Sequence, residues 1–281
     1  MSLPVGASIR VAGLEGRLLA ESERGDGGHQ VVSVRVGGRE LVLKLYGRKR
    51  GVGATLLRGF GHRFLVGKTG LHPRTRRDTE ERVLRTWRNH GFAVPEVLEL
   101  RLPEPDPRPL LALEHVSGRT VSAELRDPTS SRPSLEAGLA RFGEAWSRRH
   151  DLAEALGEPA LVHAHPSFNH VIDRGGEWVS FDFEYAYTDP RRVPTLIAVE
   201  IAGFVGSLAH YAGERFEPLL AALVAGYPRR GRLARAGREA MVGRFPLAEQ
   251  ASRVVPALRA QGRKKLRDGL SALARELERA G

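Results

Sequence analysis

Four places in this 281-residue chain carry side chains that could do chemistry: a lysine, a glutamate, a histidine-rich stretch and an aspartate. The residues are Lys44, Glu80, His163, His165, His170 and Asp182. A lysine and a glutamate that both face an interior each need a counter-charge, so they are candidates for a buried ion pair. Carboxylate oxygen suits a hard metal ion, and neutral imidazole can accept a proton near pH 7 or bind a transition metal.

The lysine lies in the third of three strands predicted in succession near the start of the chain. The strands are expected at 16–21, 31–36 and 40–46, and two more at 94–100 and 110–116. Gly37-Gly38 predicts a two-residue hairpin turn, because both glycines can adopt positive φ. Residues 47–76 have no clear period and are expected to form a long basic loop with a short helix.

The glutamate is placed by helical spacing. Val83, Leu84 and Trp87 recur at helical intervals within a helix expected at 75–89. Glu80 lies four residues before Leu84 and seven before Trp87, so it shares their face, and a carboxylate on an inward face needs a cationic partner.

The remainder of the chain is predicted to be mainly helical. Helices are expected at 135–149, 195–212, 216–225 and 245–280, with two short strands and a turn at 171–180. These elements would place the histidine-rich stretch and Asp182 on either side of a small hairpin.

The order of these features resembles the protein-kinase-like superfamily. A glycine-rich turn, Gly25-Asp26-Gly27-Gly28, is followed by the strand lysine, the helix glutamate, the histidine-rich loop and Phe181-Asp182-Phe183-Glu184. The pattern is most similar to lipopolysaccharide-core (Kdo and heptose) kinases and to aminoglycoside and choline kinases. The resemblance implies a bilobal α+β fold. Its N-lobe, 1–116, would hold a five-stranded antiparallel sheet, one helix and the basic insert 47–76, and its C-lobe, 117–281, would be helical with basic C-terminal helices.

The resemblance also implies a site for ATP or another purine nucleotide with Mg²⁺. Lys44 would contact the phosphates and Glu80 would hold Lys44 in place. Asp182 would bind the metal. The remaining nucleotide contacts would come from the glycine turn and from the backbone of the strand-to-loop hinge, namely Gly25, Gly27, Gly28, Glu114 and Val116.

The catalytic loop departs from the family pattern of His-x-Asp, four residues, then Asn. The chain has His163-Ala164-His165-Pro166-Ser167-Phe168-Asn169-His170. Aligned on His163, His165 replaces the catalytic aspartate and His170 replaces the metal-binding asparagine. Shifted by one residue, Asn169 matches but Ala164 takes the catalytic position, so neither alignment restores the aspartate.

Three interpretations of this loop stay open. The chain is a pseudokinase or weakly active phosphotransferase that keeps the nucleotide cleft. Alternatively, it is an active kinase of a sugar, lipopolysaccharide or lipid hydroxyl. Its catalytic residues would be His165, as base, and His163, which in the family pattern supports the loop by bonding the backbone near the metal-binding aspartate. In the third, His163, His165, His170 and Asp182 bind a transition metal such as Mn²⁺ or Zn²⁺.

The net charge and the composition limit the classes of partner that the chain is expected to bind. The net charge of +11 divides into +9 over 47–90, +9 over 228–281 and −7 over the remainder, which favours an anionic sugar, lipid or lipopolysaccharide near the cleft. A non-enzymatic binder of nucleic acid or of a membrane surface is the rival class. The absence of cysteine excludes disulfides and thiolate metal sites. With no signal peptide and no apolar run near the roughly 20 residues of a spanning helix, the expected location is cytoplasmic or membrane-peripheral.

Overall fold

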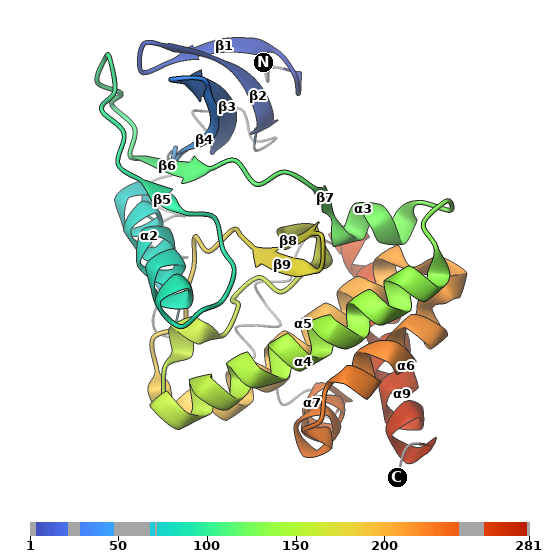
Figure 1. The fold of residues 1–281 in the computed structure, drawn as a ribbon. Coiled ribbons are helices and arrows are strands. Elements are labelled where there is room, and N and C mark those ends of the chain that lie inside the picture. Colours follow the sequence, from blue (N-terminus) through green and yellow to red (C-terminus); the bar gives the residue numbers. More distant parts are fainter. Residues whose placement is uncertain (1–3, 22–28, 48–67, 71, 242–255, 280–281) are drawn as a thin grey trace.

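The computed structural model of this chain describes residues 4–21, 29–47, 68–70, 72–241 and 256–279, with 239–241 and 256–267 described by backbone alone. An antiparallel sheet lies at one end of the molecule and a group of helices at the other, with a small hairpin between them (Figure 1). The predicted basic insert lies largely outside the described residues, as do residues 245–255 of the predicted last helix.

The large sheet has six strands in the order β1-β2-β3-β4-β6-β5, all neighbours antiparallel. The strands are β1 (Ser8–Val11), β2 (Leu14–Glu21), β3 (Gln30–Val36), β4 (Arg39–Leu45), β5 (Val97–Leu98) and β6 (Leu110–Glu114). The prediction of five strands was wrong because it missed β1. That strand has only four residues, and the tight turn that joins it to β2 uses positive φ at Ala12 and Gly13.

Strand β4 is an interior strand whose two faces have different surroundings. Leu41, Leu43 and Leu45 are buried in an apolar cluster with residues of β2 and β3. Since side chains alternate across a strand, Lys44 points to the opposite face. There it lies between the strand partners Val31 and Leu111, 6% exposed.

Helix α2 (Pro73–Asn89) covers that second face of the sheet (Figure 1). Pro73 lies in its first turn, where a missing N–H costs nothing, and Gly91, with φ of +76°, follows its end. The buried residues recur every three or four positions, which confirms that Glu80 shares the face of Leu84 and Trp87. This face carries the glutamate to the sheet.

The second half of the chain is mainly helical, as expected. Its elements are β7 (Arg119–Thr120), α3 (Val121–Arg126), α4 (Arg132–Leu156), η1 (Pro159–Leu161), η2 (Phe168–His170), β8 (Val171–Arg174), β9 (Glu177–Ser180), η3 (Pro190–Arg192), α5 (Val193–Tyr211), η4 (Gly213–Arg215), α6 (Phe216–Gly226), α7 (Arg230–Met241) and α9 (Pro256–Arg279). Strands β7, β8 and β9 form a small antiparallel sheet. The predicted division at 116/117 falls in the segment between β6 and β7 and stays a prediction.

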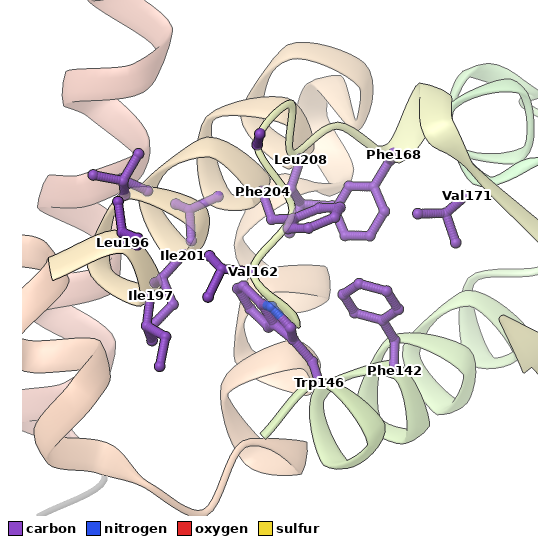
Figure 2. Close-up of a cluster of buried hydrophobic side chains, with 14 of the residues drawn as sticks. Phe142, Trp146, Val162, Phe168, Val171, Leu196, Ile197, Ile201, Phe204 and Leu208 are labelled. Carbon is purple, nitrogen blue, oxygen red and sulfur yellow. The ribbon is translucent and has the colours of Figure 1, made fainter. Parts of the chain in front are cut away.

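Helix α5 is the centre of the helical part. Phe204, Ile201 and Leu208 are almost completely buried and pack with Phe142 and Trp146 of α4 (Figure 2). The span 190–211 is long and apolar enough to cross a membrane by composition, yet 67% of the relevant window is buried inside the molecule. We therefore interpret α5 as a core helix; the prediction that no apolar run approaches the length of a spanning helix was wrong.

Helices α4 and α6 pack backbone against backbone where each has a glycine. A Cβ atom added to Gly226 would lie 1.9 Å from the carbonyl oxygen of Ala140, and one added to Gly143 would lie 2.6 Å from that of Leu223. These distances are far below van der Waals contact, so only glycine permits this approach of the two helices.

We predict that Gly226→Ala lowers the free energy of unfolding by about 1–3 kcal/mol, because the helices must move apart to admit the methyl group. Gly237→Ala is the matched control, since a Cβ there meets nothing within 4 Å and alanine favours the helix by up to about 1 kcal/mol. Urea unfolding of both variants provides the measurement. Equal stability of the two variants would contradict this account of the packing.

Candidate functional site

The ammonium of Lys44 is the centre of the site. Its Nζ lies 2.7 Å from Oε2 of Glu80 and 2.7 Å from Oδ1 of Asp182, and 3.4 Å from Oε1 of Glu184. Burial acts against the charge, but the carboxylates of Asp182, Glu80 and Glu184 together raise the pKa of Lys44 above its ordinary range. Lys44 is therefore a fixed, fully charged cation between two halves of the chain. The pairing of Lys44 with Glu80 is the one that the sequence predicted.

Glu80 is 2% exposed and every part of its carboxylate is engaged. Besides Lys44, it accepts hydrogen bonds from the hydroxyl of Tyr46 at 2.6 Å and from the backbone N–H of Phe183 at 3.3 Å. A buried carboxylate needs this satisfaction, because an unpaired charge in the interior is very costly. Glu80 thus connects α2 to the end of β4 and to the segment that follows β9.

Asp182 and Glu184 come from the segment directly after β9. Asp182 has a φ of +70°, a left-handed conformation that aspartate tolerates better than most residues. Although burial acts in the other direction, Lys44 holds the pKa of Asp182 well below its usual range. Glu184 is bound by Arg76 of α2 through two guanidinium nitrogens and lies 2.9 Å from Nε2 of His29.

The donors around Lys44 fit a divalent cation. Within the described part of the chain, one group of three is compact enough to hold a metal: His29, Asp182 and Glu184, whose ligand atoms lie within 4.8 Å of one another. The two carboxylates suit Mg²⁺, whereas the imidazole suits Mn²⁺ or Zn²⁺ better. The carboxylates of Glu80, Asp182 and Glu184 also outnumber the cations Lys44 and Arg76, so a further cation is electrostatically favoured.

His163 has a structural role in the histidine-rich loop. It is 1% exposed, its Nε2 lies 3.1 Å from the carbonyl oxygen of Phe181, and its Nδ1 accepts a hydrogen bond from the backbone N–H of His165 at 3.1 Å. Both ring nitrogens are therefore engaged with the backbone and neither is free to ligate a metal. Burial and the neighbouring His170 lower the pKa of His163 to about 4.

His165 lies in a cationic and poorly solvated environment. Burial and the ammonium of Lys68 lower its pKa to about 3. Lys68 itself is 5% exposed and donates a hydrogen bond to the carbonyl oxygen of Ala164 at 3.0 Å. The imidazole of His165 packs against the ring of Tyr185, with centroids 5.1 Å apart. His165 is neutral at pH 7 and is a weak proton acceptor.

His170, not Asn169, faces the aspartate. Nε2 of His170 lies 3.5 Å from Oδ2 of Asp182, and its Nδ1 lies 3.0 Å from the carbonyl oxygen of His165. Asn169 is exposed, and its Oδ1 accepts a hydrogen bond from the hydroxyl of Ser122 at 3.0 Å. This geometry favours the alignment in which His170 takes the position of the metal-binding asparagine.

The histidine-rich loop is bound to α4 and α5 by residues that the sequence analysis missed. Glu200 in α5 is fully buried and accepts a hydrogen bond from the backbone N–H of His163 at 2.8 Å. Arg149 pairs with Glu200 and donates to the carbonyl oxygen of Leu161 at 2.6 Å, and the indole N–H of Trp146 donates to Glu200 at 3.0 Å. The sequence feature that could have revealed this cluster is the single glutamate in an otherwise apolar helix, because a buried carboxylate needs a buried partner.

The remaining predicted nucleotide contacts stay predictions. Gly25, Gly27 and Gly28 lie outside the described residues. Glu114 ends β6, and its carboxylate accepts from the backbone N–H of Glu96 at 3.2 Å and from Arg174 at 3.1 Å. Val116 follows in the connecting segment and is partly exposed.

The strand order, the helix glutamate beside a strand lysine, the aspartate after a small hairpin and the helical second half form the arrangement that the resemblance to the protein-kinase-like superfamily implied. No protein-family model matches the chain, and no curated protein matches it.

Comparison with solved structures returns kinases and phosphotransferases at low similarity. WaaP in complex with acyl carrier protein is 15% identical with a TM-score of 0.41, over 80% of this chain and 88% of that one. A thermostable mutant of aminoglycoside phosphotransferase APH(4)-Ia is 14% identical with a TM-score of 0.40, over 98% and 96%. The Mycobacterium tuberculosis PknI kinase domain is 15% identical with a TM-score of 0.39, over 98% and 100%. Such values say nothing about substrate.

We predict that stability falls as the pH is lowered from 6.5 towards 4.5. The buried His163 stays neutral in the folded protein down to its pKa of about 4, whereas in the unfolded chain it binds a proton near pH 6.5. The unfolded state therefore binds more protons, and each such histidine reduces the unfolding free energy by at most about 1.4 kcal/mol per pH unit in this window.

Urea unfolding across this pH range tests the prediction through the slope, not through the absolute stability. His163→Gln is expected to show a shallower slope than the wild type, and Gly237→Ala, which removes no titrating group, is expected to keep the wild-type slope. A His163→Gln slope equal to that of the wild type would show that His163 is charged in the folded protein.

Proposed function

We propose that the chain binds a purine nucleotide, such as ATP, together with a divalent cation, and that it transfers the phosphoryl group weakly or not at all. The observation that carries the proposal is the position of the Lys44 ammonium, 2.7 Å from both Glu80 and Asp182. A cation fixed in this way is suited to contact phosphate oxygens, and Asp182 with Glu184 is suited to hold the metal.

The residues of the chain would act mainly by binding and positioning. Lys44 attracts the phosphate oxygens, and Glu80 keeps the ammonium directed into the cleft because its own position is fixed by Tyr46 and Phe183. Asp182 and Glu184 would hold a bound Mg²⁺, which would supply positive charge to neutralise the phosphates. The anionic nucleotide and the cation would enter together, because the site already holds more carboxylates than permanent cations.

The weak or absent transfer follows from His165. A general base is efficient when its pKa lies near the working pH, and a pKa of about 3 makes His165 a poor acceptor of a hydroxyl proton at pH 7. The alternative of an active kinase with His165 as base requires that binding of nucleotide and metal raise this pKa by several units.

The acceptor, if transfer occurs, is proposed on charge alone. Residues 47–90, which lie between the lysine strand and the end of α2 in the chain, carry a net charge of +9. A basic segment of this kind favours an anionic sugar, lipid or lipopolysaccharide substrate.

We predict that ATP with Mg²⁺ raises the melting temperature, because a ligand at 100 times its dissociation constant stabilises the folded state by about 2.7 kcal/mol. The double variant Lys44→Met/Glu80→Gln, which removes both buried charges together, is expected to lose this shift while remaining folded. Arg82→Gln, an exposed change on α2, is the matched control and is expected to keep it.

The measurement is a thermal-shift panel of ATP, GTP and ADP with Mg²⁺, Mn²⁺ or Zn²⁺. The nucleotide-binding proposal fails if no combination shifts the wild type. A shift that disappears with added salt and persists in the double variant would favour the electrostatic surface binder instead.

We further predict that His165→Asp gains ATP-dependent phosphoryl transfer or ATP hydrolysis by at least tenfold, because a positioned carboxylate base typically contributes about 10²–10⁴-fold. His165→Asn is the matched control: it has the same shape but cannot accept the proton. Release of radiolabelled phosphate measures the turnover. Wild-type turnover equal to that of His165→Asp would instead establish the active kinase.

A further inference from the structure

A cavity lies between the end of α2, the outer side of α4 and the β8–β9 hairpin, away from the Lys44 site. Its volume is about 280 Å³, and Lys44, His165 and Asp182 do not line it. This volume is at the lower end of the range for small-molecule sites and suits a ligand with a single ring.

Five of the fourteen residues that line the cavity are aromatic. Trp87, Phe142, Trp146 and Trp178 contribute to its wall, together with Phe92. The rings contact one another edge to face or tilted: the centroids of Phe142 and Trp178 are 5.8 Å apart and those of Phe142 and Trp146 are 5.7 Å apart. Such a wall favours a flat apolar ring through burial and aromatic contact.

One indole in this wall has an unused hydrogen-bond donor. The N–H of Trp87 donates to the carbonyl oxygen of Ala160 at 2.8 Å, and that of Trp146 donates to Glu200 at 3.0 Å. The N–H of Trp178 is buried but has no acceptor within the described part of the chain. Because this N–H is closed off from solvent, a ligand in the cavity would contact the ring of Trp178 and not its donor.

The rim of the cavity carries two uncompensated positive charges. Arg141 and Arg148 line it from the exposed side of α4, seven residues apart and hence on the same face of the helix. Neither makes a hydrogen bond or an ion pair with the described residues, unlike the buried Arg149, which pairs with Glu200. Glu177 also lines the cavity, but Arg174 binds its carboxylate at 3.0 Å.

We propose that this cavity binds a small aromatic carboxylate, with its ring among the tryptophan and phenylalanine side chains and its carboxylate paired with Arg141 or Arg148. Guanidinium groups bind planar carboxylates well, often through two parallel hydrogen bonds. The site is separate from the proposed nucleotide cleft and does not depend on it.

The chain itself supplies the probe for a test. It contains three tryptophans, Trp87, Trp146 and Trp178, and all three line this cavity. Tryptophan emission therefore reports on this one place in the molecule. Titrating the full chain with benzoate is expected to give a saturable change in emission, with a dissociation constant at least about tenfold below that of benzyl alcohol, which has a similar shape but no charge.

Three variants locate the binding. Arg141→Gln/Arg148→Gln is expected to weaken benzoate binding to the level of benzyl alcohol, and Ala145→Leu, which fills the cavity, is expected to abolish it. Arg39→Gln, an exposed change on β4 in the sheet, is the matched control for charge and is expected to bind as the wild type does. Circular dichroism confirms that each variant is folded.

A failure of this proposal can be distinguished from a failure of the nucleotide-binding proposal. Lys44→Met/Glu80→Gln is expected to retain benzoate binding even though it loses the nucleotide. The proposal is overturned if benzoate gives no saturable change, if benzyl alcohol binds equally well, or if the double arginine variant binds benzoate as the wild type does.

Discussion

The buried ammonium of Lys44 is the interaction on which the arrangement of the molecule depends. Its nearest carboxylates come from α2 and from the segment after β9, while the lysine itself belongs to the sheet. Removing any one of these elements would leave an uncompensated charge in the interior, which costs more than a typical core substitution. The relative positions of the sheet, the helix and the hairpin are therefore fixed by one shared electrostatic requirement.

The part of this ion-pair cluster that depends on local sequence patterns could be predicted from the sequence. Periodicity placed Glu80 on the inner face of α2, and alternation placed Lys44 opposite the buried leucines of β4, so their meeting followed from local patterns. The sequence analysis missed strand β1 because four residues show too little alternation of apolar and polar side chains to be recognised as a strand. The partners of Glu200 could not be predicted, since the carboxylate, Arg149 and the loop backbone are brought together by tertiary packing.

The histidine-rich loop is held in shape by contacts to its backbone. Its fixed points are backbone atoms: the N–H of His163 bound by Glu200, the carbonyl oxygen of Leu161 bound by Arg149 and the carbonyl oxygen of Phe181 beside His163. Since none of these contacts uses the side chain of residue 165, that position can change without collapse of the loop. The contacts that fix the backbone of the loop are therefore separate from the side chain at position 165.

The hydrogen bonds of helix α2 determine which part of the molecule it moves with. Its Trp87 is bound to the carbonyl oxygen of Ala160, and its Glu80 is bound to the backbone N–H of Phe183, so the helix is attached to the helical part of the molecule. On the side of the sheet, among the described residues, Glu80 is bound by Lys44 of β4 and by the hydroxyl of Tyr46, which follows β4. If the two parts swing apart, the motion will separate the sheet from α2 at these contacts and at the hydrogen bond from Arg77 to the carbonyl oxygen of Leu110, and the helix will move with the histidine-rich loop.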